Sequence, residues 1–261
     1  MRIALGIEYE GRGYAGFQRQ NDHKSVQGEL EQALSQIAAE KVELCCAGRT
    51  DAGVSATGQV VHFDVTHERS DKSWVLGTNT KLPPDIAVTW AKHVPDSFHA
   101  RFSARARRYR YILQNTLNRP GVLSKGVSVY YGAYDAAAMQ QAAQLLLGEH
   151  DFSSFCGADD ESRSKNRCVH YLDVSRHGAF IVFDIAANAF LNHMVRNIVG
   201  SLLMVGNGSR DATWFGEVFA KHDRNAAGPT AKPGGLYLVD VTYSSEFALP
   251  RRECLGPLWL E

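Results

Sequence analysis

Apolar and polar residues alternate at the start of the chain, where Ile3, Leu5, Ile7 and Tyr9 predict a half-buried strand over residues 2–9. The spacing then lengthens to that of a helix, and Ser25 is a favourable N-cap for a helix running to about residue 39. The pattern predicts further strands at 42–47, 59–65 and 86–94, and a helix at 73–80. This alternation is typical of a split βαβ, ferredoxin-type unit.

The second half of the chain mixes the same two spacings. Alternation predicts strands at 105–113, 169–175 and 180–186, and a last strand that starts at Leu236. Helical spacing predicts helices at 135–148, 188–200 and 211–221. We therefore expect two α+β domains, residues 1–104 and 105–261.

Composition narrows the class of protein. Of the 261 residues 44% are hydrophobic and 21% are charged, as in a globular protein, and no apolar run approaches the length of a membrane span. The net charge is zero, so a nucleic-acid partner would have to be recognised by local clusters of charge. The start of the chain lacks the layout of a signal peptide. Five cysteines without regular spacing predict reduced thiols in a cytosol, namely Cys45, Cys46, Cys156, Cys168 and Cys254.

A short polar segment separates the strands predicted at 42–47 and 59–65. Gly48 and Gly53 bracket Arg49, Thr50 and Asp51 there. Glycines are common where the backbone turns sharply, and a turn held by two strands suits a reactive carboxylate, because the strands fix it and the loop exposes it. The alternative is that Asp51 only stabilises the turn through its own backbone.

The string at residues 46–54 resembles the active-site motif of the TruA family of tRNA pseudouridine synthases, with its Gly-Arg-Thr-Asp-Ala-Gly-Val core intact. This resemblance implies that Asp51 is the catalytic nucleophile. The family commonly has His after the Val of this motif, where this chain has Ser55.

The stretch from residue 97 to 134 contains no Asp or Glu, although it carries several cations. It is either a solvated basic face or a surface that follows RNA phosphates, and its aromatic residues favour RNA. In a strand over 105–113, Arg107 and Tyr109 would share one face, while Arg108 and Arg110 share the other. Residues 98–104 also resemble a family motif, and Tyr109 matches the tyrosine that packs against the target base. The cations are Arg101, Arg105, Arg107, Arg108, Arg110, Arg119 and Lys125.

Two further loops carry candidate residues. The glycine-rich loop at 10–20 offers Tyr14, Phe17 and Arg19 for stacking and phosphate contact. The polar loop at 159–167 holds Arg163 and Lys165.

In the helix predicted at 188–200, Arg196 lies among apolar residues. An unpaired buried charge is costly, so we expect Arg196 to pair with Asp51. The family keeps a similar His-Met-Val-Arg-Asn string, and commonly has a second His where this chain has Asn192.

The resemblance covers residues 3–238 and implies two ferredoxin-like halves whose sheets join across a central RNA-binding cleft. It implies a cytoplasmic homodimer that isomerises uridine to pseudouridine at positions 38, 39 and 40 of the anticodon arm of tRNA, with no cofactor and no metal. The predicted site is catalytic Asp51, the substrate-binding residues Tyr109, Arg49 and Leu236, and the supporting residues Arg196 and His193. Predicted RNA contacts are Arg19, Arg69, Phe98, His99, Ala100, Arg101, Phe102, Arg163 and Lys165.

Two other functions compete with this interpretation. A non-catalytic RNA-binding protein could use the basic stretch alone, but it would not need Arg49 and Asp51 between two glycines. A hydrolase could pair Asp51 with His62 or His193, but no H-x-x-x-H, H-x-E or G-x-S-x-G string accompanies them.

Overall fold

The computed structural model of this chain describes residues 1–121 and 126–250, so Lys125 and Cys254 lie outside the described residues. The chain divides into two units. The first contains Met1–Ala106 and, among the described residues, 237–250, and the second is Arg107–Leu236. The sequence predicts one domain over residues 105–261, but the structure groups the last strand, from Tyr237 onward, with the first unit. This strand pairs with the strand of the first unit that contains Ser55 and Ala56.

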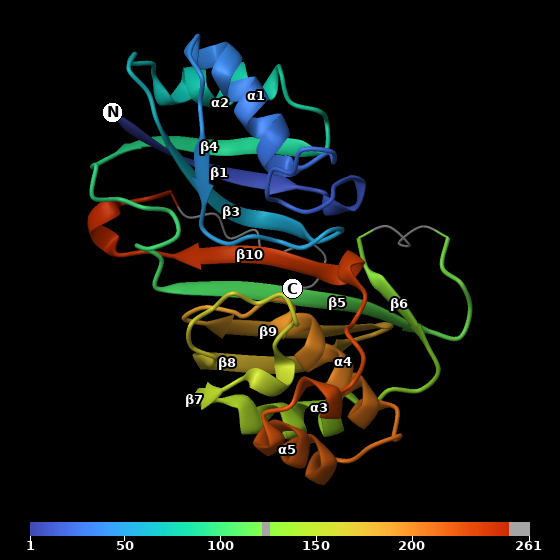
Figure 1. The fold of residues 1–261 in the computed structure, drawn as a ribbon. Helices are drawn as coiled ribbons and strands as arrows, with labels where there is room; N and C mark the ends of the chain where they lie inside the picture. The colour runs from blue at the N-terminus through green and yellow to red at the C-terminus, as the bar shows by residue number, and fades with distance from the viewer. Residues whose placement is uncertain (122–125, 251–261) are drawn as a thin grey trace. The chain divides into compact units, whose positions relative to one another are not determined.

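The first unit contains a mostly antiparallel sheet with the strand order β4-β1-β3-β10, in which β2 also pairs with β3 (Figure 1). Strand β1 is antiparallel to β3 and β4, whereas β10 runs parallel to β3. The strands are β1 (Arg2–Tyr9), β2 (Leu44–Cys46), β3 (Ser55–Asp64), β4 (Ile86–Val94) and β10 (Leu236–Thr242).

Two helices pack on this sheet, α1 (Val26–Ala38) and α2 (Asp71–Asn79). Helix α1 begins after Ser25, whose hydroxyl accepts a hydrogen bond from the Gly28 amide, as the sequence predicts. In α2 the fully buried Trp74 packs edge-on against Phe63 of β3, with ring centroids 5.3 Å apart. Aromatic burial of this size anchors the helix to the sheet.

The second unit contributes five neighbouring strands, in the order β6-β5-β9-β8-β7. Strands β8 and β9 form a hairpin through Gly178, which has a positive φ of 58°. Short strands β6 and β7 flank the longer ones, and β6 is parallel to β5. The bounds are β5 (Ala106–Thr116), β6 (Ser128–Tyr131), β7 (Gly148–Asp151), β8 (Asn166–His177) and β9 (Phe180–Ala187).

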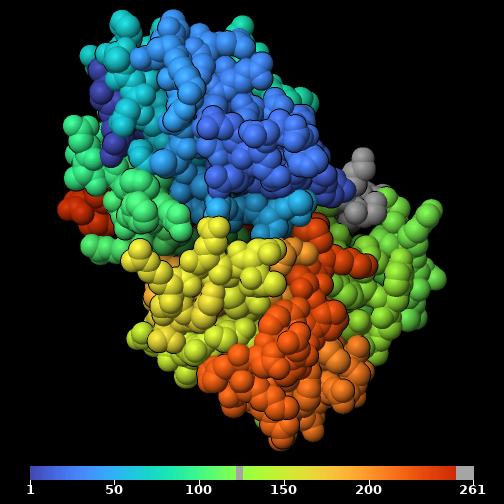
Figure 2. All heavy atoms as spheres, viewed as in Figure 1, coloured from blue at the N-terminus to red at the C-terminus, as the bar shows by residue number. Residues whose placement is uncertain are grey.

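Three helices complete the second unit: α3 (Ala136–Ala143), α4 (Met194–Gly206) and α5 (Ala212–Lys221). Asp135 and Asp211 cap α3 and α5 through side-chain hydrogen bonds to backbone amides. The space-filling view shows α1 (blue) on the surface of the first unit and α5 (orange) on the surface of the second (Figure 2). None of the described helices is long and apolar enough to cross a membrane.

The prediction of a helix over 188–200 is wrong in its first half, because α4 starts only at Met194. The backbone before Met194 forms hydrogen bonds outside the helix. The Asn192 amide donates to Asp160 at 2.6 Å, and the Asn192 carbonyl accepts from Gly157 at 2.8 Å. His193 then takes a left-handed φ of 58° before the helix begins.

A buried carboxylate holds β5, β8 and β9 together. Asp184 accepts hydrogen bonds from Arg108 at 2.7 and 2.8 Å, from Arg110 at 2.6 Å and from Tyr171 at 2.8 Å. Burial opposes ionisation of Asp184, but these donors outweigh it and lower its pKa. Two of the seven cations of the acid-free stretch are therefore paired with an acid that lies far along the sequence. The prediction that the whole stretch follows phosphates is wrong for Arg108 and Arg110.

We expect Asp184→Asn to lower the free energy of unfolding by about 3 to 5 kcal/mol, because two guanidinium groups lose their shared carboxylate. Urea unfolding at pH 7 measures this change. Asp173→Asn is the matched control, since Asp173 faces Asp184 in the strand register but is exposed, and it should change stability by less than about 0.5 kcal/mol. Equal effects of the two substitutions would contradict a stabilising role for the buried cluster.

Candidate active site

The candidate carboxylate lies on a tight turn between β2 and β3. The two strands pair up to Cys46 and Val61, and the Ala47 amide donates to the Val60 carbonyl at 2.8 Å. The turn then closes through a hydrogen bond from the Val54 amide to the Asp51 carbonyl at 3.1 Å, with Gly53 at a φ of 79°. Asp51 is half-buried. Its backbone is therefore fixed while its side chain retains access to solvent.

The glycine-rich loop at 10–20 supports this turn from outside. The Phe17 amide donates to the Thr50 carbonyl at 3.0 Å. Gly16 has a φ of 108°, and a Cβ atom there would lie only 2.9 Å from the same carbonyl oxygen. Arg49 is exposed and donates to Gln18 at 3.2 Å. The loop thus lies directly beside Arg49 and Asp51.

The prediction that Tyr14 and Phe17 offer rings for stacking on RNA is wrong. Tyr14 is 4% exposed and Phe17 is 1% exposed. The Tyr14 hydroxyl donates to Asp85 at 2.6 Å, and burial together with this bond raises the pKa of Tyr14. These rings anchor the loop, and Arg19 at its edge forms an ion pair with Glu31.

The loop after β4 presents a cation and an aromatic ring to solvent. Arg101 is exposed, its guanidinium lies 5.7 Å from the centre of the Phe102 ring, and Phe102 is 76% exposed. Phe98 and Ala100, in contrast, are fully buried. Of these predicted RNA contacts, the side chains of Arg101 and Phe102 are therefore accessible, whereas those of Phe98 and Ala100 belong to the core.

Two histidines shape this exposed loop. His62 on β3 accepts a hydrogen bond from the Ala100 amide at Nδ1, over 3.1 Å. His99 accepts from the amides of Arg101 and Phe102 at its own Nδ1, over 3.2 and 3.3 Å. These bonds require both imidazoles to be unprotonated at Nδ1.

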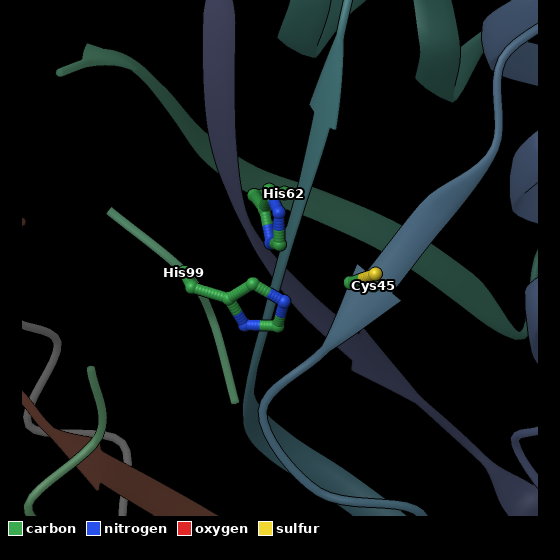
Figure 3. Close-up of side chains that lie close together, drawn as sticks. All are labelled: Cys45, His62 and His99. Carbon is green, nitrogen blue, oxygen red and sulfur yellow. The ribbon is translucent and has the colours of Figure 1, made fainter. Parts of the chain in front are cut away.

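His62 and His99 also lie beside Cys45, and one potential ligand atom from each lies within 4.8 Å of the others (Figure 3). A metal ion would have to bind the remaining Nε2 atoms, which carry the proton when Nδ1 accepts a hydrogen bond. Metal-bound histidines instead donate from their other nitrogen to an acceptor. Here the other nitrogen faces backbone amide donors, so this group fits a metal ion poorly.

The second unit holds the other predicted substrate residues. Tyr109 on β5 lies opposite Ile185 of β9, is 8% exposed, and packs edge-on against Phe190 at 5.0 Å. Leu236 is buried at the start of β10. Arg196 is half-buried and lies in the first turn of α4 rather than in mid-helix, with its Nε donating to the Ala231 carbonyl at 2.9 Å. Its pairing with Asp51 of the first unit stays a prediction.

The remaining predicted RNA contacts differ in their exposure to solvent and in whether they pair with an acid. Lys165 donates to Asp160 at 2.7 Å, so it already has an acidic partner. Arg163 is exposed on the same loop. Arg69 is half-buried at a groove between α1 and α2 that Ile37 and Lys72 also line.

The comparisons with known proteins identify the class of this chain. A family model described as tRNA pseudouridine synthase matches residues 6–103 and 142–244. The chain belongs to the tRNA pseudouridine synthase family, and it is thus an isomerase that converts uridine to pseudouridine in tRNA. The resemblance seen in the sequence is confirmed.

Two relatives that are named tRNA pseudouridine synthase A match this chain over nearly their whole length. The chain is 59% identical to the tRNA pseudouridine synthase A of Shewanella sp. (strain W3-18-1) over 260 residues, which cover 100% of this chain and 99% of that protein. It is 60% identical to the protein of the same name from Aeromonas hydrophila subsp. hydrophila, covering 100% of this chain and 96% of the relative. Among solved structures, the "archaeal box H/ACA sRNP Nop10-Cbf5 complex" is similar over 86% of this chain and 59% of that chain, at 10% identity and a TM-score of 0.36.

We expect stability to fall as the pH drops from about 6.5 to about 4. Burial, helped by the charges of His99 and Arg2 and opposed by Asp64, lowers the pKa of His62 to about 4 from 6.5, and burial likewise lowers that of His99 next to Arg2 and Arg101. The folded protein therefore binds fewer protons than the unfolded chain in this window, which costs about 1 to 3 kcal/mol at its acid end.

Urea unfolding at several pH values between 7 and 4 checks this expectation. In His62→Asn the amide oxygen can still accept from Ala100, but the side chain no longer titrates, so the pH dependence should become shallower. His67→Asn, at an exposed position, is the control and should keep the slope of the wild type. Identical slopes in His62→Asn and the wild type would show that His62 does not cause the acid sensitivity.

Proposed function

We propose that this synthase modifies uridines 38, 39 and 40 in the anticodon arm of tRNA and that Asp51 is its nucleophile. The observation that carries the proposal is the Gly-Arg-Thr-Asp-Ala-Gly-Val turn, whose backbone is fixed by β2, β3 and the loop at 10–20 while Asp51 and Arg49 retain access to solvent. A turn that only joined two strands would not need this support on both sides.

The reaction breaks the N1–C1′ bond of uridine and forms a C5–C1′ bond. Position C5 loses a proton and N1 gains one, so atoms and electrons balance without an oxidant, a reductant or a phosphoanhydride. A carboxylate can assist by attacking the ribose, by adding to the uracil ring or by moving the C5 proton. In each role it must be ionised and held at a fixed distance from the base, which suits a side chain on a rigid turn.

The other substrate contacts follow from the resemblance and from the chemistry of the side chains. Tyr109 packs on the extruded uracil, and its Phe190 neighbour holds the ring in place. Leu236 provides an apolar wall. Arg49 occupies the space that the extruded base leaves or keeps Asp51 ionised. Arg196 pairs with Asp51, while His193 sets the start of α4.

The RNA surface that we propose combines exposed and half-buried cations with one exposed ring. Arg101 and Phe102 form its centre, because a guanidinium beside an aromatic face can contact phosphate and stack on a base. Phe98, His99 and Ala100 hold this loop rather than contact RNA through their side chains. The surface also includes Arg19, Arg69, Arg163 and Lys165.

At the level of the whole molecule, the resemblance supports two ferredoxin-like halves whose sheets join across an RNA-binding cleft. It also supports a homodimer that works in the cytoplasm without a cofactor. These properties are part of the proposal.

We expect Asp51→Asn to abolish pseudouridine formation while tRNA affinity stays within about threefold of the wild type. Asparagine keeps the volume and the turn-forming ability of aspartate but loses its charge and its nucleophilicity. Single-turnover assays with a tRNA transcript and chemical mapping of pseudouridine measure the effect. Asp22→Asn, at an exposed position in the same unit, is the control. A mutant that keeps a tenth of the wild-type rate constant would remove Asp51 from the nucleophile role.

We expect Arg101→Ala to reduce the slope of log affinity against log salt by about one unit for all tRNAs tested, because one phosphate contact is lost. Arg210→Ala is a matched control, since Arg210 is also exposed beside an aromatic ring, with its guanidinium 5.6 Å from Trp214. Filter binding at salt concentrations from about 50 to about 300 mM measures this slope for both variants. An unchanged slope in Arg101→Ala would show that Arg101 faces away from the RNA.

A further inference from the structure

Beneath the Asp51 turn lies a buried network of polar side chains. Gln59 on β3 is fully buried, Tyr9 at the end of β1 is 5% exposed, and Thr50 is 7% exposed. The hydroxyls of Tyr9 and Thr50 lie 2.7 Å apart. Buried polar groups are tolerated where they are hydrogen-bonded, and losing a partner leaves the other group unsatisfied.

Gln59 connects this hydroxyl pair to the backbone on the other side of Arg49. Its Nε2 donates to the Gly48 carbonyl at 2.7 Å and lies 3.5 Å from the Tyr9 hydroxyl, while its Oε1 accepts from the Gly48 amide at 3.4 Å. Both backbone polar groups of Gly48 are therefore bonded to one side chain. Gln59 is paired with Ile7 of β1, so the sheet fixes the backbone from which this side chain extends.

We propose that Tyr9 and Gln59 are positioning residues, which fix Gly48 and Thr50 and thereby set the direction of Arg49 and Asp51. Each side chain bonds a residue adjacent to Arg49, and Thr50 is also adjacent to Asp51. With the Thr50 carbonyl tied to Phe17, the residue before Asp51 is held through both its side chain and its backbone. A misplacement of about 1 Å at a reacting group can cost about 100-fold in rate. The inference rests on the proposed role of Asp51.

The hydroxyl pair allows a test with small changes of shape. Tyr9→Phe and Thr50→Val each remove one hydroxyl, and both should lower the single-turnover rate constant about 10- to 100-fold while the tRNA Kd stays within about threefold. The double variant should be no slower than Tyr9→Phe, because Tyr9→Phe already breaks the bond to Thr50, together with the contact to Gln59. Thr50→Ser keeps the hydroxyl and should restore the rate constant to within about threefold of the wild type.

Two further variants separate positioning from stability. Thr78→Val, in α2 of the same unit, removes a buried hydroxyl that has no hydrogen-bond partner, so it should leave the rate constant unchanged. Gln59→Leu should reproduce the kinetic pattern of Tyr9→Phe. All rates are measured well below the thermal midpoint of each variant, so that the fraction of folded protein is the same.

The outcomes distinguish this inference from the proposed function. Wild-type rate constants in Tyr9→Phe and Thr50→Val, or losses that simply add in the double variant, would overturn the positioning role while an inert Asp51→Asn leaves the proposed function standing. An active Asp51→Asn would instead overturn the proposed function, and with it the need to direct that carboxylate. A loss of rate in both single variants, rescue by Thr50→Ser and non-additivity would establish the positioning role.

Discussion

The site depends on one constraint, which is that a loop between paired strands must satisfy its backbone polar groups without a strand partner. Around Asp51 this is achieved with side chains and with a neighbouring loop, as Gln59 bonds Gly48 and Phe17 bonds the Thr50 carbonyl. The same bonds that stabilise the turn also fix its conformation. A carboxylate on such a turn needs no reorganisation to meet its substrate, which is the advantage of a preorganised site.

The distribution of charge shows why distance along the chain is a poor guide to electrostatics. A segment without acids includes Arg108 and Arg110, yet both bond Asp184 in the adjacent strand β9. These two cations stabilise the sheet of the second unit. Arg101 has a different environment, exposed beside Phe102. The basic stretch thus contains both structural cations in the sheet and exposed cations such as Arg101, and only accessible cations can release counterions from RNA.

Local signals in the sequence predict much of the fold and fail where tertiary bonds decide. Ser25 marks the start of α1 correctly because an N-cap acts within a few residues, and the helices predicted from residues 135 and 211 begin directly after Asp135 and Asp211, which cap them. The predicted start of α4 is too early, because the Asn192 amide donates to Asp160, which lies more than thirty residues away in the sequence. Strands β6 and β7 are only four residues each and carry too little alternation to be recognised. In the candidate site, the sequence motif predicts Asp51. No motif predicts Tyr9 and Gln59, which follow the pattern of ordinary strand residues.

The neutral histidines His62 and His99 support a loop backbone through hydrogen bonds, as the buried side-chain amide of Gln59 does at the Asp51 turn. His62 and His99 use Nδ1 to accept backbone amides, and burial keeps the pKa of both below that of a free imidazole. Protonation would replace these acceptors by donors and release the loop that carries Arg101 and Phe102. In each loop an uncharged polar side chain thus holds the backbone at or next to an exposed arginine: Gln59 bonds Gly48, which precedes Arg49, and His99 accepts from the amide of Arg101. Because the supporting groups carry no charge of their own, they add no field that would compete with the phosphates or the base for those guanidinium groups.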